Sequence, residues 1–189
     1  MSAARERILD AASAVLSERG AAHATTREIA RLAGCSEALL YKHFADKRAL
    51  QLAVLRERAA GLDALGETAG TGDVRENLVD VVETLLAHYT ATFPIIASLF
   101  SSRALLAAWR DGMTGRGAGP RSPLRMLERY LDGEVELGRL DRGLDAFAVA
   151  ALLCGAAFQH AYLACFDGLA AVPQARLLAE RLVDAAVDL

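Results

Sequence analysis

The chain has 189 residues, a formal net charge of −3, and a composition that is 53% hydrophobic but only 6% aromatic. This length allows one or two domains with a sizeable core, and the abundance of alanine and leucine favours an all-α fold. The three cysteines show no CxxC or Cys/His spacing. We therefore expect free, buried thiols in a reducing compartment and no metal site.

The charges are unevenly distributed along the chain. Residues 1–60 contain ten Lys or Arg and seven Asp or Glu, a net charge of +3, whereas the remainder contains 11 and 17, a net charge of −6. A basic amino-terminal module on an acidic body is suited to a phosphate-bearing partner at one end. The alternative is chance asymmetry of a few charges.

The amino-terminal residues predict an amphipathic helix from about Ala4 to Arg19 that ends at Gly20, and they do not have the pattern of a secretory signal. No apolar run reaches the roughly 18 residues needed to span a membrane. We therefore expect a soluble, cytoplasmic protein.

Residues 25–44 predict two short helices joined by a sharp turn. Thr25 can cap the first helix, with Glu28 in the position of a capping-box partner. Gly34 suits the left-handed position just after a helix, and Ser36 can cap the second helix. These signals place the turn between two helices of about seven residues each.

The second of these helices has an inner and an outer side. Leu40 and Phe44 are four residues apart and face inward together. The outer surface keeps the remaining residues, Glu37, Leu39, Tyr41, Lys42 and His43. Because so short a helix is unstable alone, it must be braced by its neighbours. A braced, exposed second helix is the layout of the helix-turn-helix, in which that helix lies in the DNA major groove.

Further helices are expected along the rest of the chain. Asp46, Asp73 and Ser122 are candidate caps, and Pro94 is expected to break the helix that Asp73 begins. The expected helices have approximate bounds 46–65, 73–92, 95–101, 103–113, 122–137, 145–167 and 173–188.

The helix over 145–167 is apolar on nearly every side, so it should be buried all round. We interpret it and the last helix as half of a four-helix bundle between two copies of the chain. The alternative is a core within one chain. The candidate dimer residues are Ala151, Gly155, Phe158, Tyr162, Leu178 and Leu182.

At residues 26–50 the sequence resembles a known family. The motif is Thr26-x-x-Ile29-Ala30-x-x-Ala33-Gly34-Cys35-Ser36-x-Ala38-x-Leu40-Tyr41-x-His43-Phe44, followed by Lys47-x-x-Leu50. It resembles the DNA-binding domain of TetR-family (tetracycline-repressor-like) transcriptional regulators. Two positions depart from the usual pattern, since Ala38 stands where glycine is usual and Cys35 where valine is commoner.

The resemblance implies an all-α fold of about nine or ten helices in two domains. Residues 2–62 would form a three-helix DNA-binding domain, with the helix-turn-helix at about 25–44, and residues 63–189 a ligand-binding and dimerisation domain. It implies phosphate-contacting or positioning roles for Thr26, Tyr41, His43 and Lys47. The full set of candidate DNA-binding residues is Thr26, Arg27, Ser36, Glu37, Leu39, Tyr41, Lys42, His43 and Lys47.

Base recognition is expected from the outer side of the second helix. Glu37 can accept a hydrogen bond from cytosine N4, Leu39 can contact a thymine methyl group, and Lys42 can reach guanine or phosphate. The alternative for Tyr41 and His43 is packing within the module.

Family members usually repress as dimers on a pseudo-palindromic operator and release it when a small molecule enters the carboxyl-terminal domain. The resemblance implies a hinge or pendulum motion of the 46–65 helix that changes the separation of the two DNA-reading helices. No cofactor is expected beyond an unidentified, largely apolar effector. The candidate lining residues are of types that are more often core than pocket, and core packing is the alternative for each: Tyr89, Phe93, Phe100, Trp109, Met113, Met126, Tyr130, Phe158 and Tyr162.

Two other classes of protein compete with this interpretation. An enzyme is disfavoured because no Ser/His/Asp spacing, glycine-rich phosphate loop or HExxH motif occurs. A helical interaction module would not require the Tyr41 and Lys47 pair or the basic amino terminus. Salt titration of duplex binding separates these classes, since phosphate contacts release counterions.

Overall fold

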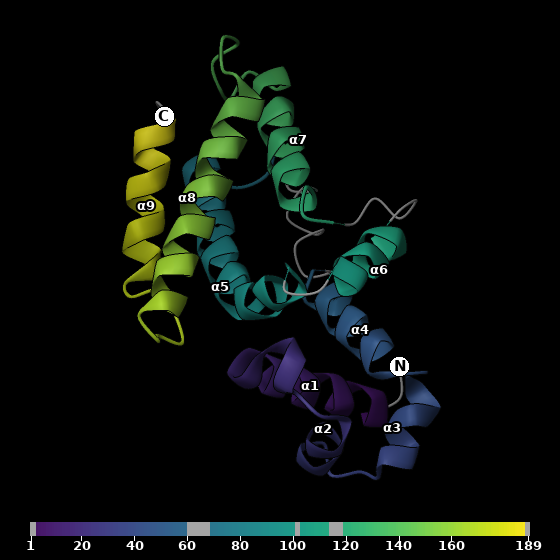
Figure 1. Ribbon diagram of the computed structural model, residues 1–189. Coiled ribbons are helices and arrows are strands. Elements are labelled where there is room, and N and C mark those ends of the chain that lie inside the picture. Colours follow the sequence, from purple (N-terminus) through teal and green to yellow (C-terminus); the bar gives the residue numbers. More distant parts are fainter. Residues whose placement is uncertain (1–2, 60–68, 101–102, 114–118, 188–189) are drawn as a thin grey trace. The chain divides into compact units, whose positions relative to one another are not determined.

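The computed structural model of the chain describes residues 3–59, 69–100, 103–113 and 119–187. Within these ranges every regular element is a helix and no strand occurs, which confirms the predicted fold class (Figure 1). The helices are α1 (Ala3–His23), α2 (Thr26–Leu32), α3 (Glu37–His43), α4 (Lys47–Ala59), α5 (Val74–Phe100), α6 (Arg103–Met113), α7 (Ser122–Glu136), α8 (Ala146–Phe166) and α9 (Ala175–Ala186).

The chain packs as two compact units. The first comprises Met1–Arg58 with Thr92–Gly117, and the second Ala59–Ala91 with Ala118–Leu189. The described residues of 92–113 thus group with the amino-terminal residues, although residues 63–189 were expected to form the second domain. The domain limits at 62 and 63 remain a prediction, because residues 60–68 lie outside the described residues.

The core of the first unit joins α1 to the three short helices that follow it. Ile8 from α1, Ile29 from α2, Leu40 from α3 and Leu50 from α4 are each at most 1% exposed. Burying these four side chains holds helices that would be unstable separately, since seven-residue helices such as α2 and α3 do not persist in water. Gly20 has a φ of 72°, so the first helix breaks at the residue where it was predicted to end.

The second unit has its own apolar core, formed by α7, α8, α9 and the part of α5 before Thr92. Leu85, Leu127, Leu153 and Val183, one from each helix, are at most 1% exposed. Helix α8 packs against both α7 and α9 (Figure 1). By length and composition α8 could cross a membrane, but it supplies seven buried residues to this core. The core helix of a soluble protein passes the same test.

Helix α5 continues through Pro94, so the predicted break after residue 92 is wrong. Proline has no N–H to donate to the carbonyl four residues earlier, which belongs to Thr90. The thiol of Cys165 on α8 lies 3.6 Å from that carbonyl oxygen and donates to it. This substitute donor explains in part how the helix tolerates a proline.

Two of the three candidate caps are confirmed. Asp46 accepts the N–H of Ala49 at 2.6 Å, and Asp73 accepts the N–H of Glu76 at 3.0 Å. The prediction for Ser122 is wrong, because Ser122 is already the first residue of α7. Its own N–H bonds to the carbonyl of Gly119 at 2.9 Å, so the chain turns before reaching it.

A buried carboxylate fixes the segment that leads into α5. Glu134 on α7 is completely buried, and its Oε1 accepts the backbone N–H of Gly70 at 3.1 Å. The guanidinium of Arg139 lies 3.3 Å from the other oxygen and offsets its charge. Because a buried carboxylate requires such partners, this segment is held in one position.

Candidate nucleic-acid interface

The turn between α2 and α3 is built from the local signals that the sequence predicted. The Thr25 hydroxyl accepts the N–H of Glu28 at 3.2 Å, and the Ser36 hydroxyl accepts the N–H of Leu39 at 3.2 Å. Between the two helices Gly34 has a φ of 66°, a left-handed conformation that suits glycine. The capping box is only half formed, because the Glu28 carboxylate pairs with Arg19 at 2.9 Å.

The inner side of α3 is anchored to the core of the first unit. Leu40 is completely buried and Phe44, which follows the helix, is 5% exposed. The Arg5 guanidinium lies 5.5 Å from the centre of the Phe44 ring, where a cation is attracted to the ring face. Anchoring at both positions fixes which side of α3 faces outward.

The nine predicted DNA-binding residues lie on α2, on α3 with its cap Ser36, and at Lys47, the first residue of α4. Arg27, Ser36, Tyr41 and Lys42 are exposed, and Tyr41 keeps 47% of its surface accessible. The half-buried members of the set are Thr26, Glu37, Leu39, His43 and Lys47. None of the nine is buried, so all could reach a partner, although their roles remain predictions.

Three of these residues form a hydrogen-bonded group that sequence reasoning missed. Thr26 Oγ1 donates to Glu37 Oε1 at 2.8 Å. The same Thr26 oxygen lies 3.2 Å from the Tyr41 hydroxyl. Thr26 belongs to α2, whereas Glu37 and Tyr41 belong to α3. Helical periodicity therefore does not relate Thr26 to the other two residues. The only available signal was that a threonine, a glutamate and a tyrosine flank one short turn.

The charge on this outer side is mainly positive. Arg27, Lys42 and Arg48 are exposed, and Lys47 is half-buried at the start of α4. Glu37 is the acidic side chain within the predicted set, and it is engaged by Thr26. A positive surface with exposed hydroxyl groups is suited to a phosphate backbone.

The predicted ligand residues are divided between the two units. Trp109 lies in the core of the first unit, whereas Met126 and Tyr130 lie in the core of the second. Phe93 is half-buried and Phe100 is exposed. The side chain of Met113 lies outside the described part of the chain. Trp109, Met126 and Tyr130 therefore pack as core residues.

Tyr89 is the centre of a small cluster in the second unit. Its ring meets the ring of Phe158 edge-on at a centroid distance of 5.5 Å, and it also contacts His88. Burial raises the pKa of the Tyr89 hydroxyl above its usual range and that of the neighbouring Cys154 thiol to about 11. Both groups are therefore neutral at physiological pH. Burial likewise raises the pKa of Tyr130 to about 12.

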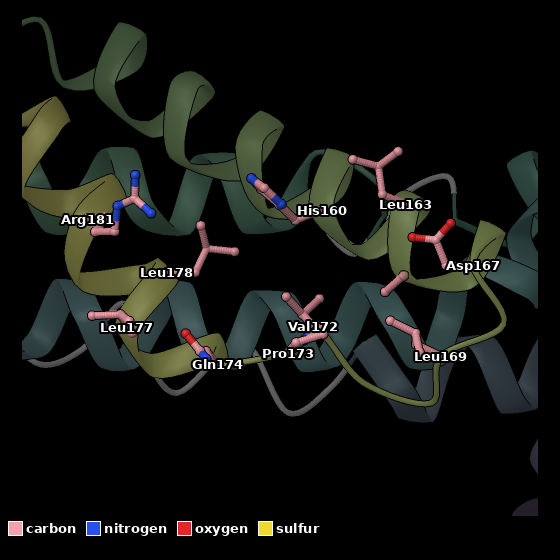
Figure 2. Close-up of a pocket in the computed structure, with 11 residues that line it drawn as sticks. His160, Leu163, Asp167, Leu169, Val172, Pro173, Gln174, Leu177, Leu178 and Arg181 are labelled. Atoms are coloured by element: carbon pink, nitrogen blue, oxygen red, sulfur yellow. The ribbon is translucent and has the colours of Figure 1, made fainter.

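Two surface cavities are present among the described residues. One, of about 360 Å³, lies between the end of α8 and the start of α9. His160, Asp167 and Arg181 contribute its charged or titratable side chains, and leucines line much of the remainder (Figure 2). The other, of about 320 Å³, lies between α1 and α2 beside Arg7 and Leu32. Neither cavity is lined by any of the nine predicted ligand residues.

The six predicted dimer residues lie at or near the surface of the chain. Ala151, Gly155, Phe158 and Tyr162 on α8 are exposed, and Leu178 and Leu182 on α9 are half-buried. The apolar surface of α8 is thus not fully buried within one chain, and burial against a second copy of the chain stays a prediction. The exposed apolar positions of α8 include Phe147, Leu152, Leu163 and Phe166, which are 40–75% exposed.

Within the described residues, no group of three or more His, Cys, Asp or Glu side chains is placed to hold a metal ion.

The braced α2–turn–α3 unit with a positive outer face defines a helix-turn-helix DNA-binding protein. Comparison with known proteins agrees. Residues 8–54 match the model of "Bacterial regulatory proteins, tetR family". A relative from Bacillus subtilis, the HTH-type transcriptional regulator YvkB, is 30% identical over 141 residues, which cover 75% of this chain and 72% of YvkB. The chain belongs to the TetR family of transcriptional regulators and is a DNA-binding regulator.

Solved structures share the whole fold. The fatty acid degradation regulator FadR from Bacillus halodurans superimposes with a TM-score of 0.74 and 18% identity, covering 99% of this chain and 96% of that one. FadR from Bacillus subtilis, solved in complex with stearoyl-CoA, superimposes with a TM-score of 0.71 and 17% identity, with 97% of each chain covered. At this level of identity the likeness extends to the fold alone.

Proposed function

We propose that the protein is a cytoplasmic repressor that binds a pseudo-palindromic operator as a homodimer. The observation that carries the proposal is that all nine candidate DNA-binding residues, which lie on or beside α2 and α3 and at the start of α4, remain accessible. In such a dimer two α3 helices would enter successive major grooves, about one helical turn apart.

In this proposal Thr26, Tyr41, His43 and Lys47 contact or position phosphates, and Glu37, Leu39 and Lys42 face base edges. Arg27 and Ser36 complete the set at the start of α2 and α3. The hydroxyl groups and cations suit phosphate, because hydroxyls can donate and Lys47 supplies a flexible charge. Leu39 is the apolar member and is suited to a thymine methyl group.

The dimer would form through α8 and α9. On α8 the exposed apolar or small residues Phe147, Ala151, Gly155, Phe158, Tyr162 and Phe166 follow one another at intervals of three or four, which places them on one side of the helix. A helix face of this kind in contact with water is costly, and a second copy of the same face would bury it. Ala151 and Gly155 would permit close approach of the paired helices.

The dimer would be controlled by a small, largely apolar ligand bound in the second domain. Tyr89 and Phe158, whose rings are in contact, are the predicted ligand residues that the structure brings together. The stearoyl-CoA complex of the Bacillus subtilis FadR makes a long acyl chain a reasonable first probe.

A direct test combines footprinting with a salt titration. The purified protein should protect a palindrome in the promoter regions that flank its own gene. Its affinity for that site should fall steeply as salt rises, because bound phosphates release counterions. Sedimentation of the complex should show two chains per site. Binding that is independent of salt, or absent, would refute the proposal.

The ligand part is tested separately with stearoyl-CoA. If it acts as an effector, it should raise the melting temperature of the protein and displace the protected DNA, since binding couples the two sites. A shift in melting temperature without displacement would argue against release, and displacement by detergent at the same concentration would show a non-specific effect.

A further inference from the structure

The direction of the hydrogen bonds in the Thr26 group follows from proton counting. Thr26 has one hydroxyl proton, and it donates that proton to the Glu37 carboxylate at 2.8 Å. An ionised carboxylate only accepts hydrogen bonds, and a hydroxyl has a single proton to give. The Tyr41 hydroxyl, 3.2 Å from the Thr26 oxygen, must therefore be the donor in their contact. The three side chains thus form a hydrogen-bonded chain in which the Tyr41 proton is directed to Thr26 and the Thr26 proton to Glu37.

This arrangement conflicts with phosphate binding by the same hydroxyls. Phosphate oxygens are acceptors, so Tyr41 and Thr26 can contact phosphate only by donating a proton. In the observed structure the Tyr41 proton is given to Thr26 and the Thr26 proton to Glu37. The negative charge of Glu37 on the same surface would also repel a phosphate. Glu37 therefore acts as an internal anion that occupies the donors which DNA would use.

We propose that Glu37 is a specificity-determining residue that competes with the DNA backbone for the hydroxyl protons of Tyr41 and Thr26. The inference rests on the proposed DNA contacts of this face. A cytosine N4 amino group is a donor that suits a carboxylate. Where such a group lies opposite Glu37, the carboxylate accepts from the base, and Tyr41 and Thr26 turn their protons to phosphate. On other sequences Glu37 retains the hydroxyl chain and binding is weaker.

A double-mutant cycle on the full-length protein tests this competition, with a mixed-sequence duplex as the probe. Glu37→Ala should tighten binding to this duplex by about tenfold, the range expected when a hydrogen bond to a charged group is released. In a Thr26→Val background the hydrogen-bonded chain from Tyr41 to Glu37 is already broken, because valine has no hydroxyl group. The same Glu37→Ala change should then give only the smaller gain from removing a repelling charge.

The control variant is Asp10→Ala, which removes an exposed carboxylate from α1 in the same unit. None of the interactions described above joins the Asp10 carboxylate to Thr26, Glu37 or Tyr41. The gain in affinity from Asp10→Ala should be the same with Thr26 or Val at position 26. Equal gains for Glu37→Ala in both backgrounds would show simple charge repulsion and would overturn the inference.

Selection from a random duplex library gives a second readout. Sites selected by the wild-type protein should carry a cytosine at one position in each half-site, and Glu37→Ala should lose that preference while keeping the others. Retention of the same preference would also overturn the inference. If the wild-type protein binds no duplex in a salt-dependent manner, the proposed function fails, and this outcome is distinct from a cycle without coupling.

Discussion

Neighbouring residues of α3 have opposite environments, and this difference separates stability from recognition. Leu40 is completely buried and holds the helix, whereas Tyr41 is 47% exposed and available to a partner. A substitution at Leu40 would create a core cavity and unfold the first unit, so it could not report on DNA contact. Substitutions at Tyr41 and Lys47 can, because neither side chain belongs to the buried core.

The first prediction concerns these two residues. Tyr41→Phe combined with Lys47→Ala should weaken binding to all duplexes and lower the salt dependence of log K by about one unit, since one phosphate contact by a cation is lost. Anisotropy titrations at several salt concentrations measure both effects, and sedimentation should show an unchanged dimer. Arg125→Ala, at an exposed position of α7, is the control. An unaltered salt slope in the double variant would remove the pair from the interface.

The second prediction concerns Cys154, whose thiol has its pKa raised by burial from 9.0 to about 11. Below pH 9 the thiol is protonated in both the folded and the unfolded chain. Between pH 9 and 11 the thiol ionises mainly in the unfolded chain, so the free energy of unfolding should fall by up to about 3 kcal/mol. Urea titrations across this range measure the loss. Cys154→Ala should show a smaller pH dependence, and equal slopes for both proteins would contradict the prediction.

Local signals predicted the start of α4 and of α5, whereas the continuation of α5 depends on a distant partner. Asp46 and Asp73 cap their helices within three residues. The continuation of α5 through Pro94 is different. Proline leaves the Thr90 carbonyl without its helical donor, and this carbonyl accepts a hydrogen bond from the Cys165 thiol, 75 positions away in the sequence. A helix end is thus decided by whether any donor, local or distant, satisfies the exposed backbone group.

The third prediction tests this substitution of donors. Cys165→Ala should lower the free energy of unfolding by about 1 kcal/mol, because it leaves the Thr90 carbonyl without the thiol donor. In a Pro94→Ala background the helix can supply its own N–H, so the same change at Cys165 should cost less. Denaturant unfolding of the four proteins measures the coupling. Equal costs in both backgrounds would show that the thiol does not replace the missing donor.

At the scale of the whole molecule, the exposed side of α8 is the feature that one chain leaves unexplained. Six of its large apolar residues are 40–75% exposed, although the opposite side of the same helix is in the core: Phe147, Leu152, Phe158, Tyr162, Leu163 and Phe166. Gly155 lies on the exposed side, and a methyl group added there meets no atom within 4 Å. A larger residue at 155 should therefore be harmless to a single chain.

The fourth prediction uses that property. Gly155→Leu should disrupt the proposed dimer by overpacking, while circular dichroism and the melting temperature at low concentration show that the chain still folds. Sedimentation equilibrium should report a dissociation constant raised at least tenfold. Asp132→Leu, which places the same side chain at an exposed position of α7, should leave the dimer intact. A normal dimer of Gly155→Leu would place the interface elsewhere.

The sequence by itself determined what depends on neighbours within about four positions. The all-α class, the caps at Thr25 and Ser36, the left-handed Gly34 and the inward pair Leu40 and Phe44 all follow from helical periodicity and local hydrogen bonds. The family motif lies in this same stretch. The exposed face of α3 was therefore predictable residue by residue.

Only the tertiary structure decided the contacts between residues from separate helices. It placed Thr26 against Glu37 and brought the Cys165 thiol to the Thr90 carbonyl, to which it donates. It also packed Trp109 into the core with the amino-terminal helices. It also showed which side of α8 the core of one chain leaves exposed. Such contacts depend on how helices approach one another, and periodicity fixes which side of a helix is apolar without fixing what will cover it.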